Sequence, residues 1–129
     1  MTTINFKREI ADSFDHAIDR IIKALAAEGF GILSRIDMHS KIKEKTGKDI
    51  VPTVILGACN PHLAHEAYTA NSDVASLLPC NAVVREIAPG KVSLELAAPS
   101  GMMRILGDEK LTRLALEADV LIRRALEKA

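Results

Sequence analysis

Two long stretches of the chain repeat apolar residues at the three- and four-residue spacing of an amphipathic helix. In residues 13–28 the apolar positions are Phe14, Ala17, Ile18, Ile21, Ile22 and Leu25. In residues 108–128 they are Leu111, Leu114, Ala115, Ala118, Ile122 and Ala125. Asp12 or Ser13 can cap the first helix, Asp108 can cap the second, and Gly29 can end the first in a left-handed conformation. We therefore expect two helices, each with one buried face.

Five other stretches have the composition of β-strands. Residues 3–7 alternate polar and apolar side chains, which suits a strand near an edge, and residues 30–36 form a second strand. Residues 51–59 carry no charge and end in an unbroken apolar run, so this strand should be covered on both faces or lie centrally. Residues 80–87 and 91–98 flank a turn sequence, Ala88-Pro89-Gly90, and predict a hairpin.

Shorter helices fill the remaining gaps. Asp37 can begin a helix over residues 38–46, and Asn60, followed by Pro61, can begin one over residues 61–70. Residues 71–73 predict a turn, and residues 102–106 a loop or one short turn. The resulting order is β-α-β-α-β-α-β-β-α in a single domain, residues 1–129. The fold class is α/β (α+β): a two-layer sandwich in which helices pack on a mixed sheet of about five strands, with residues 54–58 in an inner strand.

Composition narrows the function classes. The 129 residues include 17 basic and 17 acidic side chains, which argues against nucleic acid or an anionic membrane as the main partner. Aromatic residues make up only 3%, so platforms for stacking bases are not expected. The sequence shows neither a signal peptide nor an apolar run long enough to span a bilayer. We expect a soluble domain in the cytoplasm, where two cysteines stay reduced rather than form a disulfide.

Each of the two cysteines is followed by an asparagine, at a boundary between an apolar stretch and a turn: Cys59-Asn60-Pro61 and Pro79-Cys80-Asn81. Cys59 can be a small buried core residue, or a thiolate acidified by the helix that begins after it. Cys80 taken alone would be structural, but its match to Cys59 suggests a shared site. We predict that the two sulfurs share one pocket without being bonded, which requires antiparallel strands or a segment 77–79 that crosses the same sheet end.

Other residues near these motifs offer weaker candidates for a site. Cys59, His62, His65 and Cys80 include zinc and copper ligand types, but both histidines are expected to be partly solvated, so no metal or other cofactor is predicted. The cysteine spacing excludes a thioredoxin-like Cys-x-x-Cys motif and a zinc finger. Met102 and Met103 can bind soft ligands, although packing is the favoured role of the pair.

Four stretches carry specific motifs: Glu28-Gly29-Phe30-Gly31-Ile32-Leu33 with Ile36-Asp37; Ile55-Leu56-Gly57-Ala58-Cys59-Asn60-Pro61; Leu77-Leu78-Pro79-Cys80-Asn81; and Ala98-Pro99-Ser100-Gly101-Met102-Met103. Together they make the chain resemble the DUF302 family of small bacterial and archaeal proteins of uncharacterised function. The resemblance covers nearly the whole chain. It implies a single α/β domain and a homodimer, and it assigns no catalytic residue. Family members often have an aspartate where this chain has Ala98.

Three functions remain open from the sequence. The leading hypothesis is a homodimeric domain that binds a small ligand near Cys59, Asn60, Pro61, Cys80, Asn81 and Met102. The second is a thiol-dependent enzyme or redox protein in which Cys59 is the nucleophile and Cys80 resolves or positions it. The third is a structural or interaction module without chemistry.

Overall fold

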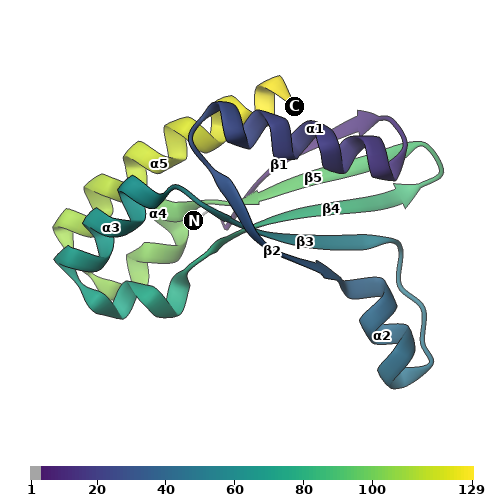
Figure 1. Cartoon of the computed structure of the whole chain (residues 1–129), viewed down its shortest axis with the longest axis horizontal. Coiled ribbons are helices and arrows are strands. Elements are labelled where there is room, and N and C mark those ends of the chain that lie inside the picture. The colour runs from purple at the N-terminus through teal and green to yellow at the C-terminus, as the bar shows by residue number, and fades with distance from the viewer. Residues whose placement is uncertain (1–3) are drawn as a thin grey trace.

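The five strands form one antiparallel sheet. The structure, a computed structural model, describes residues 4–129. Its strands are β1 (Asn5–Ala11), β2 (Gly31–Asp37), β3 (Thr53–Cys59), β4 (Cys80–Ala88) and β5 (Lys91–Ala97). They lie side by side in the order β1-β5-β4-β3-β2 (Figure 1), which confirms that β3 is an inner strand.

The prediction of a mixed sheet is wrong, because all four strand pairings are antiparallel. β1 and β2 are separated by one helix but lie at opposite edges, so their connection crosses the sheet and creates no parallel neighbours. The first strand also differs from the predicted residues 3–7. It begins at Asn5 and runs to Ala11, and Thr3 lies outside the described residues.

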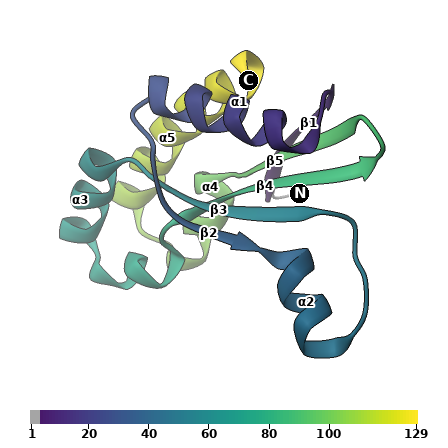
Figure 2. The ribbon, with the colours of Figure 1, turned by 45° about the vertical axis from the view of Figure 1, so that its right-hand side comes forward.

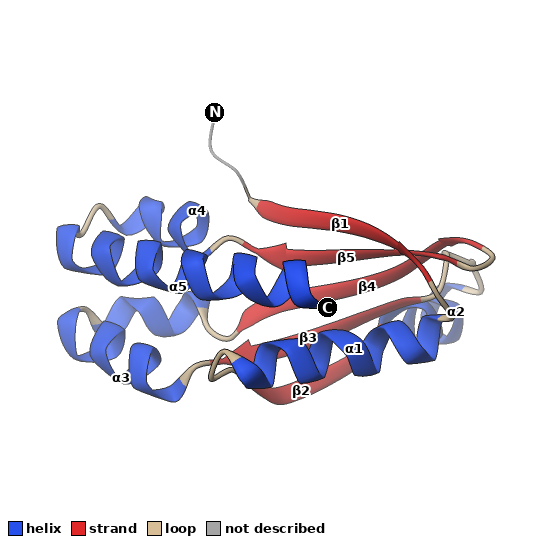
Figure 3. Cartoon of the chain, turned by 90° about the horizontal axis from the view of Figure 1, so that it is seen from above, coloured by secondary structure: helices blue, strands red, loops and turns tan. Residues whose placement is uncertain are grey.

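Two long helices, α1 (Phe14–Ala27) and α5 (Glu109–Lys128), lie on the same face of the sheet (Figures 1 and 3). This confirms the α/β class and the two packed layers. Ser13 caps α1 by accepting a hydrogen bond from the backbone N–H of His16, and Gly29 follows the helix with a φ of +88°. Phe30 then donates its N–H to the Leu25 carbonyl and is only 4% exposed, so the chain turns back onto the last helical turn.

Five short helical elements lie at the two ends of the sheet. They are the helices α2 (Met38–Thr46), α3 (Pro61–Ala70) and α4 (Pro99–Met103) and the 3₁₀ helices η1 (Ser72–Leu77) and η2 (Arg104–Leu106). The turn predicted at residues 71–73 leads into η1, and residues 102–106, predicted as a loop or one short turn, end α4 and form η2. Their turns are too short to show helical periodicity, so the sequence pattern did not reveal them.

The main hydrophobic core, here called the sheet cluster, lies between the sheet and its two long helices. Its buried members come mainly from α1, from strands β3, β4 and β5, and from the C-terminal half of α5; they include Ile18, Ile21, Leu56, Val84, Leu94 and Ile122. Successive side chains of a strand point to opposite faces of the sheet, so every second residue of each strand points toward this core.

A second, smaller core lies beyond the end of the sheet, where α3, α4, η1 and the first half of α5 gather (Figures 1 and 2). We call it the helical-end cluster; its buried members are Ala67, Val74, Met103, Leu111 and Ala115. The fold thus has two cores that share helix α5.

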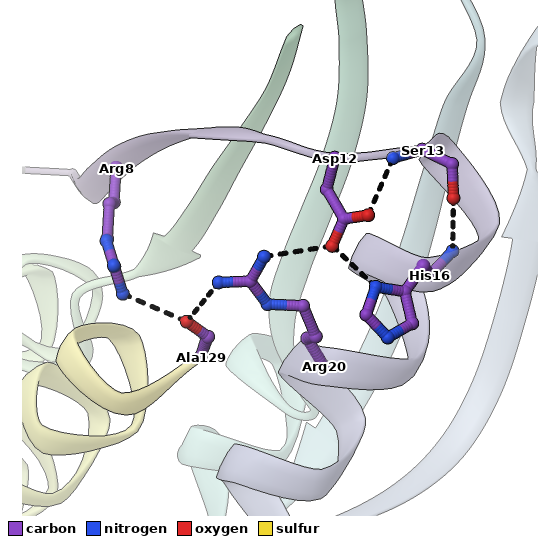
Figure 4. A network of polar contacts seen from close by, with 6 residues as sticks. All are labelled: Arg8, Asp12, Ser13, His16, Arg20 and Ala129. Carbon is purple, nitrogen blue, oxygen red and sulfur yellow. Dashed lines mark hydrogen bonds and ion pairs between the residues drawn. The ribbon is translucent and has the colours of Figure 1, made fainter. Parts of the chain in front are cut away.

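A network of polar contacts closes the other end of α5 (Figure 4). Arg8 and Arg20 both donate to the backbone carbonyl of Ala129, at 3.0 and 2.8 Å. Arg20 also pairs with Asp12 at 2.9 Å, and His16 contacts the same carboxylate at 2.6 Å. The Arg20 guanidinium, more than the other contacts, lowers the pKa of Asp12 to about 2. The network connects β1, α1 and the end of α5.

The opposite face of the sheet lies open beneath β3, β4 and β5, with α2 at its far edge (Figures 1 and 2). The strand register places Ile55, Val83, Arg85 and Glu95 on this face. Arg85 donates to the Glu95 carboxylate at 3.0 Å. Within residues 4–129, no helix is both long and apolar enough to cross a membrane.

Candidate functional site

The two cysteines meet at one end of the sheet, as predicted. β3 and β4 are antiparallel, and Cys80 lies directly opposite Ala58, the residue before Cys59. The last residue of β3 and the first residue of β4 are therefore neighbours across the ladder. Both cysteines are free thiols.

Both cysteines line a cavity of about 50 Å³ at the junction of the sheet cluster and the helical-end cluster. Apart from the two thiols and the Asn60 amide, the side chains that line it are apolar. Helix α3 contributes Leu63, Ala64 and Ala67. Helix α5 contributes Leu111, Leu114, Ala115 and Ala118. The cavity is thus a gap between two cores, with sulfur as its main polar feature.

The other residues predicted for the ligand site divide into two groups. Asn60 lines the cavity, and its side-chain oxygen accepts a hydrogen bond from the Leu63 N–H at 3.2 Å, so it caps α3 as expected. Pro61, Asn81 and Met102 were expected at the site, but the structure does not place them in the cavity lining. Pro61, in the first turn of α3, and Asn81, which follows Cys80 in β4, are both exposed.

Met103, and not Met102, faces the cavity. The side chain of Met103 is 6% exposed and belongs to the helical-end cluster. Pro99 also lines the cavity, and the two residues are four apart on one face of α4. Proline favours the first turn of a helix, so Pro99 could have indicated from the sequence that a helix begins there and that Met103 shares its face.

Burial keeps both thiols protonated. Desolvation, with smaller contributions from the nearby Cys59 and Asp119, raises the pKa of Cys80 to about 11. Desolvation also raises the pKa of Cys59 above its ordinary value of 9.0. This is the opposite of the acidification expected at the start of α3, because loss of water outweighs the helix N-terminus here. An enzyme that relies on a thiolate of Cys59 at neutral pH gains no support from this environment.

The histidines do not join the cysteines. His62 and His65 are both exposed on α3, on the side away from the packed Leu63 and Ala67. Among residues 4–129, no group of three or more His, Cys, Asp or Glu side chains is placed to hold a metal ion. The mixed set of Cys59, His62, His65 and Cys80 is therefore not assembled as a ligand sphere.

One acidic residue that the sequence did not single out supports the cavity wall. Asp119 of α5 is 6% exposed and accepts hydrogen bonds from the backbone N–H and the Oγ of Ser100, at 3.0 and 2.5 Å. Ala98 occupies the capping position of α4 and makes no side-chain cap. Asp119 thus supplies the cap from another helix and fixes α4, which carries Pro99 and Met103, against α5.

Comparisons with known proteins agree with the motif resemblance. The family model described as "Domain of unknown function DUF302" matches residues 6–129. The chain is also similar to a solved structure, an uncharacterized conserved DUF302 protein from Bacillus stearothermophilus, with 27% sequence identity, a TM-score of 0.90 and 98% of each chain covered. No significant match was found among curated proteins. The chain belongs to the DUF302 family of uncharacterised domains.

Proposed function

We propose that this domain binds a small ligand in the cavity between its two cores, next to the reduced thiols of Cys59 and Cys80. The observation that carries the proposal is the convergence of two cysteines, from two strands, on one apolar cavity. Buried thiols that were only packing residues would not need an adjoining gap, since protein interiors are normally close-packed. The proposal places the domain in a reducing compartment such as the cytoplasm.

The size of the cavity restricts the ligand. Pockets for drug-sized molecules have volumes of about 300–1,000 Å³, whereas this cavity has about 50 Å³. It has room for a single ion or a molecule of a few atoms. The apolar lining favours a ligand that needs few hydrogen bonds, because unpaired polar groups are costly to bury.

Xenon is a suitable probe, because it enters dry apolar cavities. We expect xenon to shift the amide resonances of Ala58 and Cys80 in ¹H–¹⁵N spectra of the reduced protein. Ala64→Leu should fill the cavity and abolish these shifts, whereas Ala26→Leu, on the exposed side of α1, should preserve them. The proposal fails if xenon leaves the cavity amides unshifted, or if Ala64→Leu responds like the natural protein.

We further propose that the domain is a homodimer in which a second copy covers the open face of the sheet. Branched apolar side chains, including Ile55 and Val83, lie on this face, and exposed apolar patches on a sheet mark interaction sites. Arg85 on the same face has a partly exposed side chain that pairs with Glu95, so the face also carries a charged pair that a second copy can contact. The implied two-fold interface brings Arg85 and Glu95 of each copy toward the other.

Light scattering tests the assembly. A dimer has twice the chain mass of 14.0 kDa. Val83→Lys should produce monomers, because it places an unpaired charge in the interface, whereas Val120→Lys, on an exposed position of α5, should not. A natural protein that scatters as a 14.0 kDa species would exclude the dimer.

A further inference from the structure

We propose that the cavity is a soft-metal site in which Cys59, Cys80 and Met103 bind one Cu(I) ion. This inference rests on the proposed ligand-binding role of the cavity and gives the ligand a chemical class.

Three sulfur-containing residues from three separate elements line one small cavity. Cys59 ends β3, Cys80 begins β4 and Met103 ends α4, and all three side chains line the cavity. The β3–β4 ladder fixes the two cysteines, and the bonds from Ser100 to Asp119 fix Met103 independently of that ladder. Such independent support is what holds a set of metal ligands in place before the metal arrives.

The types of donor atom in the cavity lining determine which metal ion the site favours. The described residues that line the cavity include no carboxylate and no imidazole, so the oxygen ligands of Mg²⁺ and Ca²⁺ and the mixed ligands of most catalytic zinc sites are missing. Thiolate and thioether sulfurs together suit Cu(I), which accepts low coordination numbers and soft ligands. A volume of about 50 Å³ also suits one ion better than an organic molecule.

Binding involves exchange of protons for the metal, with no change of oxidation state. Cu(I) forms two Cu–S bonds as the thiols of Cys59 and Cys80 each lose a proton to solvent, and the Met103 thioether adds a third, neutral donor. The complex carries one net negative charge. Helix α3 begins directly after Cys59 and Asn60, and its N-terminus favours a negative charge at this place.

The experiment is an anaerobic titration of the reduced, full-length protein with Cu(I) in competition with the chromophoric chelator bicinchoninate. We expect one Cu(I) per chain, an ultraviolet thiolate-to-copper band, and release of two protons per ion in weakly buffered solution. Ag(I), a similar soft ion that does not undergo redox chemistry under these conditions, should bind with the same stoichiometry.

Variants locate the ion. Cys59→Ser and Cys80→Ser should each lower Cu(I) affinity by at least about 100-fold, and Met103→Leu by about 10-fold, given that even outer-shell changes cost about 10–100-fold. Met102→Leu is the matched control, because Met102 is adjacent in sequence but outside the cavity lining, and it should bind as the natural protein does.

Several results would overturn the inference. Cysteine variants with unchanged affinity, one Cu(I) per two chains, or equal losses for Met102→Leu and Met103→Leu would each exclude the site as described. Xenon distinguishes this failure from failure of the broader proposal: a protein whose cavity takes xenon but does not bind Cu(I) retains a ligand cavity and loses only the metal assignment. A protein that accepts neither probe loses both.

Discussion

The sheet cluster and the helical-end cluster differ in how tightly their surroundings constrain them. The sheet cluster is enclosed by five hydrogen-bonded strands on one side and by α1 and α5 on the other. The helical-end cluster is held by short helices and turns that project beyond the sheet and pack against the first half of α5. The sheet cluster is therefore the more rigid of the two, and the helical-end cluster can accommodate a cavity beside it.

The cavity lies where these two regions meet, and this position explains its composition. Cys59 and Cys80 lie at strand ends, next to the boundary between the two clusters, and Met103 lines the cavity from the helical end. A ligand site needs incomplete packing next to rigid elements, and a junction of two cores provides both.

The largest effect should come from removing a leucine from the sheet cluster. Leu94→Ala, at a fully buried position, should lower the free energy of unfolding by about 4 kcal/mol, because the rigid sheet cannot collapse into the space. Leu111→Ala in the helical-end cluster should cost about 2–3 kcal/mol and enlarge the cavity, because the short helices can shift. Urea denaturation measures both.

Leu116→Ala provides the baseline for this pair. Leu116 is 53% exposed on α5, and its loss should change stability by less than about 0.5 kcal/mol. If Leu111→Ala destabilises the protein as much as Leu94→Ala does, the two clusters are equally constrained and the comparison is wrong.

A glycine in β3 tests how closely the two regions are joined. A Cβ added at Gly57 would meet the Ser34 side chain and come within 2.7 Å of Cγ of Pro79, in the segment that joins η1 to β4. Gly57→Ala should therefore destabilise the protein by about 1–3 kcal/mol through overpacking. Thermal unfolding in comparison with Gly31→Ala measures this, because a Cβ at Gly31 meets nothing within 4 Å. Equal melting temperatures for the two variants would show that Pro79 moves away freely.

Loss of the Asp119 carboxylate should loosen the helical end while leaving the sheet intact. Asp119→Ala removes both acceptors of Ser100 and should cost about 1–2 kcal/mol. Hydrogen exchange should accelerate at the amides of α4, with β4 and β5 still protected. The control is Glu117→Ala, on the exposed face of α5. Uniform acceleration across the sheet would mean that the two regions unfold as one unit.

The smallest effect concerns the network around Asp12, at the edge of the sheet cluster. The pKa of Asp12 is about 2 in the folded protein, compared with an ordinary value of 3.8, so the unfolded chain binds more protons between these values. The stabilisation is complete above the ordinary value and is lost as pH falls through about 2. Urea midpoints of the natural protein and Asp12→Asn should therefore differ near neutral pH and converge in acid.

Arg20→Gln tests the cause of this pH dependence. Arg20 is the main reason for the low pKa of Asp12, so this variant should lose most of the acid-dependent part of stability. A difference between the natural protein and Asp12→Asn that widens as pH falls would contradict the assignment.

The sequence by itself determined the local elements of this protein. The apolar spacing of α1 and α5 and the caps at Ser13 and Asn60 follow from interactions between residues close in the chain. The uncharged, apolar composition of β3 also predicted its inner position. The family motifs, likewise, are local. The meeting of Cys59 and Cys80 was predicted on the condition that their strand ends are antiparallel neighbours, and the tertiary structure met this condition.

Only the tertiary structure decided the rest. Strand order and direction depend on which distant segments pair, so the antiparallel sheet replaced the mixed one. The helical-end cluster, and with it the choice of Met103 over Met102, depends on how short helices pack against α5. The raised pKa values of both cysteines depend on burial, which a local sequence pattern does not measure. The chemistry available at this site is thus set by long-range packing around residues that the sequence had already singled out.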